Sequence, residues 1–473
     1  MSSVAEHQLE PAEARSPLVV GLDRALLRVD TVFDLFAAAL FRRPLPTLLA
    51  LTTLLAHGPA AFRRRLAELH ALDAEGLPVR EEVLAWLADE KARGRPVHLA
   101  CDGETATAER LAEHMGLFDG VHETGALAAA FPAGFAYAGA RGADMAVWRQ
   151  ATSAVVVASP ALERRVAAVA PVERGFRPGE GRLRDWLKAA RPHQWSKNVL
   201  VLAPVALGLH LVTQAGLLRA VAAMLLLCVI ASLTYLVNDA ADLEADRRHW
   251  SKRRRPLASG ALPVGPALLA AGIGIPVVLA AGFWLSMAVG LCLSLYVVTT
   301  LAYSFALKRI PLVDGVVIGG LFTLRLAVGI AAAGLEWSAW LLTFSTFFFF
   351  SLAIAKRHTE ILRVAEAGEG PVRGRGYRVE DAALTLAFGV SAAMASILIV
   401  VLYLVEEVFP RSAYADPAWL WAAPPLMFVW VARVWFLAHR GRMNDDPVVF
   451  ALKDPVSLGL GAALGAAFLL ALT

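Results

Sequence analysis

Apolar positions are spread unevenly along this 473-residue chain. Residues 1 to about 184 mix apolar and charged positions, with no uninterrupted apolar run long enough to cross a bilayer. From about Trp186 onward, long apolar windows follow one another. A helix that crosses a hydrocarbon core needs roughly 17 to 25 apolar residues. The pattern predicts a mixed N-terminal region followed by a membrane domain.

Nine windows of spanning length can be placed in the second region. They are Val199–Leu211, Leu217–Val237, Pro263–Trp284, Leu285–Leu307, Val313–Ala333, Trp337–Ala355, Ala382–Leu404, Trp419–Leu437 and Pro455–Leu472. The composition agrees, because 57% of the residues are hydrophobic and only 18% are charged, whereas about a quarter are charged in soluble domains. Wholly soluble, fibrous and disordered chains are excluded.

The N-terminal region alternates short apolar runs with helical patterns. Strands are expected at Leu18–Asp23, Val97–Cys101, Ala136–Gly139 and Ala154–Ala158, and helices at Thr31–Leu40, Glu81–Lys91 and Thr105–Met115. Such alternation is typical of an α/β domain with a mainly parallel sheet. We therefore expect a multi-domain fold: an α/β domain over residues 1–170, a linker and interfacial amphipathic helix over 171–190, and an all-α polytopic membrane domain of nine transmembrane helices over 191–473.

Basic residues indicate the orientation of the membrane domain. Lys and Arg gather in the loops after the second, fourth, sixth and eighth windows, and the alternate loops hold little beyond Arg219 and Arg411. Short loops rich in Lys and Arg stay in the cytoplasm. The first residues are polar, without the apolar stretch of a signal peptide. We expect a multi-pass protein of the plasma membrane, with its N-terminal domain and active site cytoplasmic and its C-terminus outside.

A cluster of carboxylates follows the second window directly. Asp239, Asp242 and Asp246 stand at i, i+3 and i+7, so on a continuous helix they share one face. Three carboxylates on one face repel one another unless a cation lies between them. Oxygen ligands without His or Cys favour Mg²⁺, with Asn238 as a further oxygen donor. A solvated helix end is the simpler alternative, but ionisable groups at membrane depth are usually functional.

Other polar residues near the cytoplasmic loops are candidates for binding anionic substrates. Basic side chains close to the acidic cluster supply counter-charge for a bound diphosphate. The candidates are Lys252, Arg253, Arg255, Lys308 and Arg309, then Lys197, Arg325, Lys356 and Arg357, with Tyr303 and Asp314 beside them. Several of these cations have a simpler alternative role, in which they set the membrane orientation or bind lipid headgroups.

Two segments resemble the aspartate-rich motifs of the UbiA superfamily of intramembrane prenyltransferases. NDAADLEAD followed by SKRRRPLASG is similar to the first motif, and Tyr303 to Arg309, continuing to Asp314, resembles the second motif region. The second motif lacks its full pair of acids, since only Asp314 remains. The resemblance covers Arg184 to the C-terminus and implies nine helices, Mg²⁺ as cofactor, and Asp239, Asp242, Asp246 and Asp314 as catalytic residues.

The segment RPHQWSKN at residues 191–198 resembles one branch of this superfamily, the decaprenyl-phosphate phosphoribosyltransferases. That resemblance implies transfer of 5-phosphoribosyl from phosphoribosyl diphosphate to polyprenyl phosphate, with release of diphosphate. Transfer of a polyprenyl group from polyprenyl diphosphate to an aromatic acceptor, as in 4-hydroxybenzoate prenyltransferases, is the alternative. A transporter is a more distant one. Nucleic-acid binding is not expected, because the basic loops are short and interleaved with acids.

The order of elements in the N-terminal region resembles haloacid-dehalogenase-like phosphatases. In that family the first strand ends in DxDGT, but here the nucleophile position is Gly21 and only the acid/base position, Asp23, keeps its carboxylate. A later metal-binding segment retains only Asp144. Phosphate chemistry of this type requires a nucleophile. We therefore expect an inactive phosphatase-like domain that acts as a scaffold or docks a protein partner whose identity is unknown.

Overall fold

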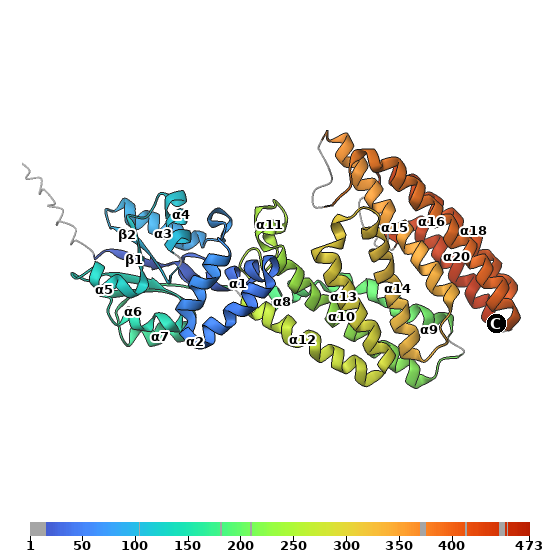
Figure 1. Ribbon diagram of the computed structural model, residues 1–473, viewed down its shortest axis with the longest axis horizontal. Coiled ribbons are helices and arrows are strands. Elements are labelled where there is room, and N and C mark those ends of the chain that lie inside the picture. The colour runs from blue at the N-terminus through green and yellow to red at the C-terminus, as the bar shows by residue number, and fades with distance from the viewer. Residues whose placement is uncertain are drawn as a thin grey trace, which may run out of the picture. The chain divides into compact units, whose positions relative to one another are not determined.

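The computed structural model describes residues 16–103, 105–179, 182–208, 211–368, 375–411, 414–443, 450–451 and 453–473 (Figure 1). The chain divides into two compact units. The first contains the chain up to Ala190 together with Tyr235–Gly272, and the second contains Arg191–Thr234 with Ile273–Thr473. The segment that carries the acidic motif thus belongs with the N-terminal α/β region, whereas the sequence predicted a simple division after residue 190.

A parallel six-stranded sheet forms the centre of the first unit. Its strand order is β3-β2-β1-β4-β5-β6, and every pairing is parallel. The strands are β1 Leu18–Gly21, β2 Val97–Cys101, β3 Gly120–Glu123, β4 Ala136–Gly139, β5 Ser153–Val157 and β6 Val172–Phe176. The prediction of an α/β domain with a mainly parallel sheet is confirmed. Strands β3 and β6 were not predicted, and β6 occupies part of the segment expected to be a linker; Glu180 and Gly181 of that segment lie outside the described residues.

Helices cover both faces of this sheet, as Figure 1 shows. Leu18 and Val20 pack into a core with α3 and α4, while Val19, pointing the other way, packs into a second core with α5, α6 and α7. Alternation of buried side chains along a strand produces these two layers. The helices of the unit are α1 Thr31–Arg42, α2 Pro44–Leu69, α3 Glu81–Ala92, α4 Thr105–Met115, α5 Leu127–Ala130, α6 Met145–Trp148, α7 Pro160–Ala167, α8 Leu183–Ala190 and α11 Leu243–Arg248.

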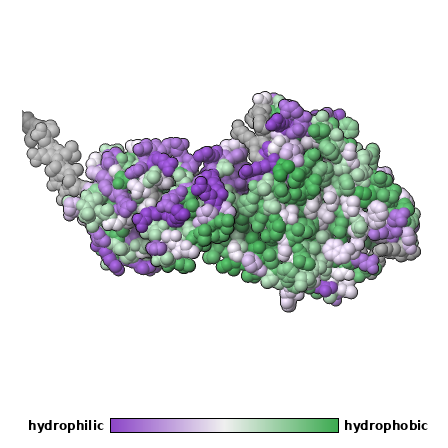
Figure 2. Space-filling model, in the orientation of Figure 1, coloured by the Kyte–Doolittle hydropathy of each residue, from purple (hydrophilic) through white to green (hydrophobic). Residues whose placement is uncertain are grey.

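Long apolar helices build the second unit, and α10 and α12 contribute residues to both units. The helices are α9 Ala203–Leu207, α10 Gln214–Ala241, α12 Val264–Leu285, α13 Met287–Phe305, α14 Val313–Ala333, α15 Ala339–Glu366, α16 Ala382–Tyr403, α17 Phe409–Arg411, α18 Ala423–His439 and α20 Pro455–Leu472. One core joins α9, α10, α13 and α14, and another joins α14, α15, α16 and α18. Figure 2 shows mostly hydrophobic atoms over the visible face of these helices and many hydrophilic atoms over the α/β region.

By length and composition, nine helices among the described residues could cross a membrane. This number was predicted, but the set differs. Eight of the helices coincide with predicted windows, whereas the ninth is α2 of the first unit. Contrary to the prediction, the N-terminal region therefore contains one helix, α2, that is long and apolar enough to span a membrane.

The first predicted window, Val199–Leu211, is not a continuous α-helix. Pro192–Leu202 forms a 3₁₀-helix and only Ala203–Leu207 is α-helical; Leu209 and His210 lie outside the described residues. A helix continuing from Pro192 would place Pro204 in its interior, where proline lacks the N–H donor. The 3₁₀ segment packs closely on α14, because a Cβ atom on Gly329 would lie only 1.9 Å from the Val201 carbonyl oxygen.

Candidate functional site

The acidic motif lies where α10 ends and α11 begins. The helix breaks at Asp242, so Asp239 and Asp246 come from different helices. Both carboxylates are buried, and both bind one guanidinium: Arg255 Nη1 lies 3.1 Å from Asp239 Oδ1 and 2.6 Å from Asp246 Oδ2. Asn238 and Asp242 are half-buried beside them. The structure brings Asp239 and Asp246 together around Arg255, but the three acids do not lie on one continuous helix as the sequence predicted.

The electrostatics of this acidic cluster suit a hard cation. Its donors are all oxygen atoms, the ligands that Mg²⁺ prefers. Lys252 Nζ approaches Asp246 Oδ1 to 3.9 Å, and Arg253 is exposed on the same short 3₁₀ turn. Burial raises the pKa of Asp246, and Arg255 opposes that shift. Among the described residues, no group of three His, Cys, Asp or Glu side chains is arranged to hold a metal ion. At the acidic cluster itself, Arg255 lies between the carboxylates of Asp239 and Asp246.

Residues of the N-terminal region hold the loop that follows the acidic motif. Arg247 Nη2 binds Asp34 Oδ2 at 2.6 Å, and both side chains are buried. Glu244 accepts from Arg42 at 2.6 Å, and its other oxygen lies 2.6 Å from His70 Nε2. Removing one partner of a buried ion pair typically costs several kcal/mol. The geometry of the motif loop therefore depends on the N-terminal region.

A second cluster, in the second unit, surrounds Asp314 at the start of α14. Asp314 is fully buried, at 0% exposure, and accepts from Arg357 Nε at 2.7 Å and from the Tyr377 hydroxyl at 2.5 Å. Arg375 Nη1 lies 3.4 Å from the same carboxylate and donates to the Tyr303 hydroxyl at 2.8 Å. The structure thus brings together the predicted residues Asp314, Arg357 and Tyr303. We call Asp314, Arg357, Arg375, Tyr377 and Tyr303 the Asp314 cluster.

Two further predicted cations, Lys308 and Arg309, lie next to the Asp314 cluster. Lys308 and Arg309 form a short 3₁₀ turn between α13 and α14. Gly376 packs on that turn so closely that a Cβ atom would lie 2.3 Å from the Arg309 carbonyl oxygen. The segment Arg375 to Tyr377 therefore lies directly against the end of this turn, at Arg309 and Pro311. Lys356, next to Arg357 on α15, is half-buried.

Arg325 is an ionisable residue in the middle of the apolar helix α14. Its Nε donates to Asn198 Oδ1 at 3.0 Å and its Nη2 to the Tyr296 hydroxyl at 3.3 Å. The Phe322 ring lies under both cations: its centroid is 5.0 Å from Arg325 Cζ and 5.8 Å from Lys197 Nζ. The 3₁₀ segment that begins at Pro192 thus places Lys197 and Asn198 of RPHQWSKN beside an intramembrane arginine.

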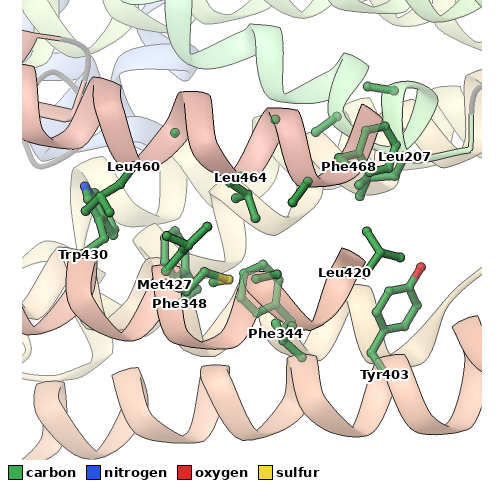
Figure 3. A pocket seen from close by; sticks show the side chains of 18 of the residues that line it. Leu207, Phe344, Phe348, Tyr403, Leu420, Met427, Trp430, Leu460, Leu464 and Phe468 are labelled. Carbon is green, nitrogen blue, oxygen red and sulfur yellow. The ribbon is translucent and has the colours of Figure 1, made fainter. Parts of the chain in front are cut away.

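An apolar cavity of about 840 Å³ lies among α9, α15, α16, α18 and α20 (Figure 3). Side chains labelled in Figure 3 that line it include Phe344, Phe348, Met427, Trp430 and Phe468. Hydroxyl groups are contributed by Tyr403, Tyr414 and Ser457, and the rest of the lining is almost entirely hydrocarbon. Such a cavity suits an aliphatic chain.

Asp23 and Asp144, the two carboxylates predicted for a phosphatase-like site, lie with Asp30 and Asp102, which were not predicted, at the carboxyl edge of the sheet, where strand order reverses at β1. Arg141 contacts all four of them: Asp23, Asp30, Asp102 and Asp144 at 3.5, 3.8, 2.7 and 3.4 Å. Arg63 binds Asp23 as well, at 2.8 Å. Two guanidinium groups therefore offset part of the negative charge of these four carboxylates.

Gly21 occupies the position where the family resemblance places a nucleophile. The Tyr137 hydroxyl of β4 fills the adjacent space, since a Cβ atom on Gly21 would lie 2.9 Å from it. Tyr137 is itself buried, and burial raises its pKa. A carboxylate at position 21 does not fit without displacement of this ring.

Several site residues were missed by the sequence reasoning. Arg375 and Tyr377 bind Asp314 from more than 60 residues away, and no local spacing links them. Asn198, Tyr296 and Phe322 around Arg325 were also missed. The sequence does contain an asparagine and an arginine in otherwise apolar surroundings. Their pairing could have been predicted, because buried polar groups are usually hydrogen-bonded to one another.

Comparisons with known proteins agree with this picture. Residues 201–453 match the UbiA prenyltransferase family. The chain is 36% identical over 478 residues to the uncharacterized protein y4nM of Sinorhizobium fredii, covering 98% of this chain and 92% of that one. It is 41% identical over 184 residues to decaprenyl-phosphate phosphoribosyltransferase of Corynebacterium glutamicum, covering 37% of this chain and 54% of that enzyme.

Among solved structures, the chain is similar to a UbiA homologue from Archaeoglobus fulgidus bound to GPP and Mg²⁺, with a TM-score of 0.46 and 16% identity, covering 60% of this chain and 97% of that one. The family match covers more than half of the chain, and the rhizobial relative covers nearly all of it. The chain belongs to the UbiA prenyltransferase family and is a multi-pass membrane transferase.

Proposed function

We propose that this transferase moves a 5-phosphoribosyl group from phosphoribosyl diphosphate to a polyprenyl phosphate and releases diphosphate. The observation that carries this choice is the RPHQWSKN segment, which contributes Lys197 and Asn198 to the polar group around Arg325. Similarity to a decaprenyl-phosphate phosphoribosyltransferase supports the same substrate pair. Both proposed substrates are anionic, in keeping with the many cations near the loops.

The acidic cluster is proposed to hold Mg²⁺ through Asp239, Asp242 and Asp246, with Asn238 as a further oxygen donor. The metal would supply positive charge that stabilises the departing diphosphate. Arg255 contacts the carboxylates, and Lys252 and Arg253 are on the same loop, which supports a role for these three side chains in binding diphosphate oxygens. Their positive charges would stabilise the negative charge that develops on the diphosphate as it leaves.

Cations near the Asp314 cluster are proposed to bind a substrate phosphate. Asp314 fixes Arg357 and Tyr377, and Arg375 is held by Asp314 and Tyr303. Lys308 and Arg309 on the adjoining turn, with Lys356 on α15, would contact the phosphate oxygens. In this role Asp314 positions other groups and does not touch substrate. The apolar cavity would take the isoprenoid tail.

The ion pairs within the first unit support the proposed membrane orientation. Residues of α1 bind the basic loop after α10, so the N-terminal region and that loop share one side of the membrane. Because α10 crosses once, the chain between Ala190 and Gln214 must cross too, although it is not one α-helix. By the distribution of Lys and Arg, we propose that the shared side is the cytoplasm of a plasma membrane.

The test is a transfer assay with the purified full chain in detergent. Phosphoribosyl diphosphate labelled in its ribose, polyprenyl phosphate and Mg²⁺ are mixed, and label entering the lipid phase is counted. We expect metal-dependent transfer by the parent, and none above background by Arg325→Met. Lys453→Met, at an exposed position near the start of α20, is the matched control and should retain parental transfer.

The alternative substrate pair is tested with the same preparation. Geranyl or longer polyprenyl diphosphate is offered with 4-hydroxybenzoate, and prenylated product is sought. Product from this pair, without any transfer of labelled ribose, would move the assignment to an aromatic prenyltransferase. Uptake of labelled substrate into vesicles without covalent transfer would instead indicate transport.

We further propose that the N-terminal domain supports the transferase and does not hydrolyse phosphate esters. Arg141 and Arg63 form ion pairs with its acidic edge, and Asp34 holds the motif loop through Arg247. Assayed with p-nitrophenyl phosphate and Mg²⁺, the full chain should show no activity that Asp23→Asn removes. Hydrolysis abolished by that substitution would contradict this proposal.

A further inference from the structure

The longest helix of the first unit, α2, consists of two parts. Gly58 interrupts it with φ +81°, and Pro59 follows. The first part, residues 44–57, contains no Asp, Glu, Lys or Arg, whereas the second part begins a charged run at Arg63. The composition of the helix thus changes at the kink.

Only one side of the first part is packed in the protein. Thr47 and Ala50 are buried, and Ala50 shares a core with Leu35 and Ala39 of α1. The opposite side carries four leucines that are 74%, 50%, 68% and 87% exposed, namely Leu45, Leu48, Leu49 and Leu55. We call these four residues the α2 outer face. Contiguous exposed apolar side chains of this size mark an interaction surface.

This helix does not cross the bilayer itself. Fourteen residues rise about 21 Å at 1.5 Å each, less than the roughly 30 Å of the hydrocarbon core. In the second part, Arg63 binds Asp23 and Asp30 near the start of α1. His70, just after α2, lies 3.1 Å from Arg42, just before it. Both ends of α2 are therefore fixed to the α/β region, and the first part must lie along a surface.

The neighbouring elements show which surface this is. The Phe33 ring of α1 lies against Gly265 in the first turn of α12, where a Cβ atom would come within 2.7 Å of it. One turn further, Leu269 of this membrane helix is exposed. The helical layer that carries the α2 outer face is therefore joined to a helix that enters the bilayer.

Charge around the helix fits a lipid surface too. Arg43 directly precedes α2, and Arg64 lies beyond the kink; both are exposed. Helices that lie in the membrane interface combine an apolar face with flanking basic residues, which bind lipid phosphates. Binding of a soluble partner protein would not explain why basic residues flank the exposed leucines.

We propose that the α2 outer face is buried at the headgroup and acyl boundary of an anionic bilayer and fixes the N-terminal domain to the membrane surface. The leucines enter the acyl region, and Arg43 and Arg64 bind phosphates. This contact is independent of which reaction the transferase performs.

The experiment uses the full chain with its three cysteines replaced by alanine. Single cysteines at Leu49→Cys, Val277→Cys and Glu109→Cys are labelled with an environment-sensitive fluorophore. Val277 is an exposed residue of α12, and Glu109 is exposed on α4 of the α/β domain. Each protein is reconstituted in phosphatidylcholine/phosphatidylglycerol vesicles with or without spin-labelled lipids.

We expect blue-shifted emission at position 49 and quenching by spin-labelled lipids at least about threefold greater than at position 109, approaching that at position 277. Leu55→Cys provides a second label on the same face, in case the first variant folds poorly. Water-like emission at both positions overturns the proposal. Blue-shifted emission without lipid quenching also overturns it, because another part of the chain, a second copy or a partner protein would then cover the face.

Discussion

The acidic cluster and the Asp314 cluster are built with opposite charges. In the first, one guanidinium, that of Arg255, bridges the buried carboxylates of Asp239 and Asp246. In the second, one buried carboxylate, Asp314, is bound by Arg357, Arg375 and Tyr377. The central ion of the first is 26% exposed, and that of the second is not exposed at all.

This difference in exposure separates two kinds of ion pair. A partly exposed arginine can exchange its carboxylate partners for a substrate phosphate at modest cost, leaving the acids to a metal. A fully buried carboxylate cannot be released, because an unpaired buried charge is expensive. We infer that the acidic cluster changes during a reaction cycle and that Asp314 stays fixed.

The largest expected effect comes from Asp314→Asn. The substitution keeps the shape of the side chain and removes its charge, so the buried Arg357 loses Asp314 and keeps its ion pair with the partly exposed Glu360. We expect a cost of about 3 kcal/mol in stability, the lower end of the range for breaking a buried ion pair. Thermal unfolding of the purified protein in detergent measures it. Asp239→Asn should cost much less stability, because Arg255 keeps Asp246. Equal losses from the two substitutions would erase the distinction between the clusters.

The next effect is on transfer itself. Asp242→Asn should lower the transfer rate at least about 100-fold, the scale observed when a group that stabilises developing charge is removed. Its unfolding temperature should stay near that of the parent. Glu406→Gln, an exposed carboxylate of the second unit, is the control. A tolerated Asp242→Asn would remove this residue from the proposed metal ligands.

A smaller effect is expected at the turn beside the Asp314 cluster. Lys308→Ala and Arg309→Ala should each raise the KM of a phosphorylated substrate about tenfold, equivalent to about 1.4 kcal/mol of lost binding. Stability should not change, since neither cation is a partner of Asp314 in the manner of Arg357. Steady-state kinetics at varied substrate concentration distinguish this from a fall in kcat. Arg440→Ala, exposed after α18, should leave KM unchanged.

The smallest effect on transfer concerns two adjacent arginines of the motif loop. Arg247 binds Asp34 in a buried pair, whereas Arg248 binds Asp73 at the surface. Arg247→Met leaves Asp34 buried without this partner and should cost several kcal/mol of stability. In the folded fraction it should raise the Mg²⁺ needed for half-maximal transfer about threefold, less than the roughly tenfold or more typical of a direct partner of a metal ligand. Arg248→Met should leave the Mg²⁺ requirement unchanged, because surface pairs are weak. Identical Mg²⁺ titrations of both variants would show that the N-terminal region does not support the motif.

The strands that the sequence predicted are the inner ones. Strands β1, β2, β4 and β5 are mostly buried runs, so their apolar pattern is plain. The missed strands, β3 and β6, form the two edges of the sheet, and apart from the buried Phe176 their residues are half-exposed or exposed. Edge strands have only one neighbour and carry polar residues, so they resemble loops.

Local pattern also explains the other successes and failures. The cluster of Asp239 and Asp246 was visible because its members are close in sequence. Arg255 was predicted to bind phosphate, and its bond to both carboxylates depends on the path of the intervening loop. The pairing of Asp314 with Tyr377 joins residues 63 positions apart, and only the packing of helices brings them together.

The close contact between Gly21 and Tyr137 has a consequence for how this domain can change over generations. A single substitution that returned a carboxylate to position 21 would meet the Tyr137 hydroxyl and disturb the buried centre of the sheet before it restored any chemistry. Recovery would need the ring to be replaced at the same time, and Arg141 and Arg63 to release the remaining acids. If this domain descends from a phosphatase, the packing of Tyr137 against Gly21 therefore opposes the recovery of a nucleophile by any single substitution. Several substitutions would have to occur together.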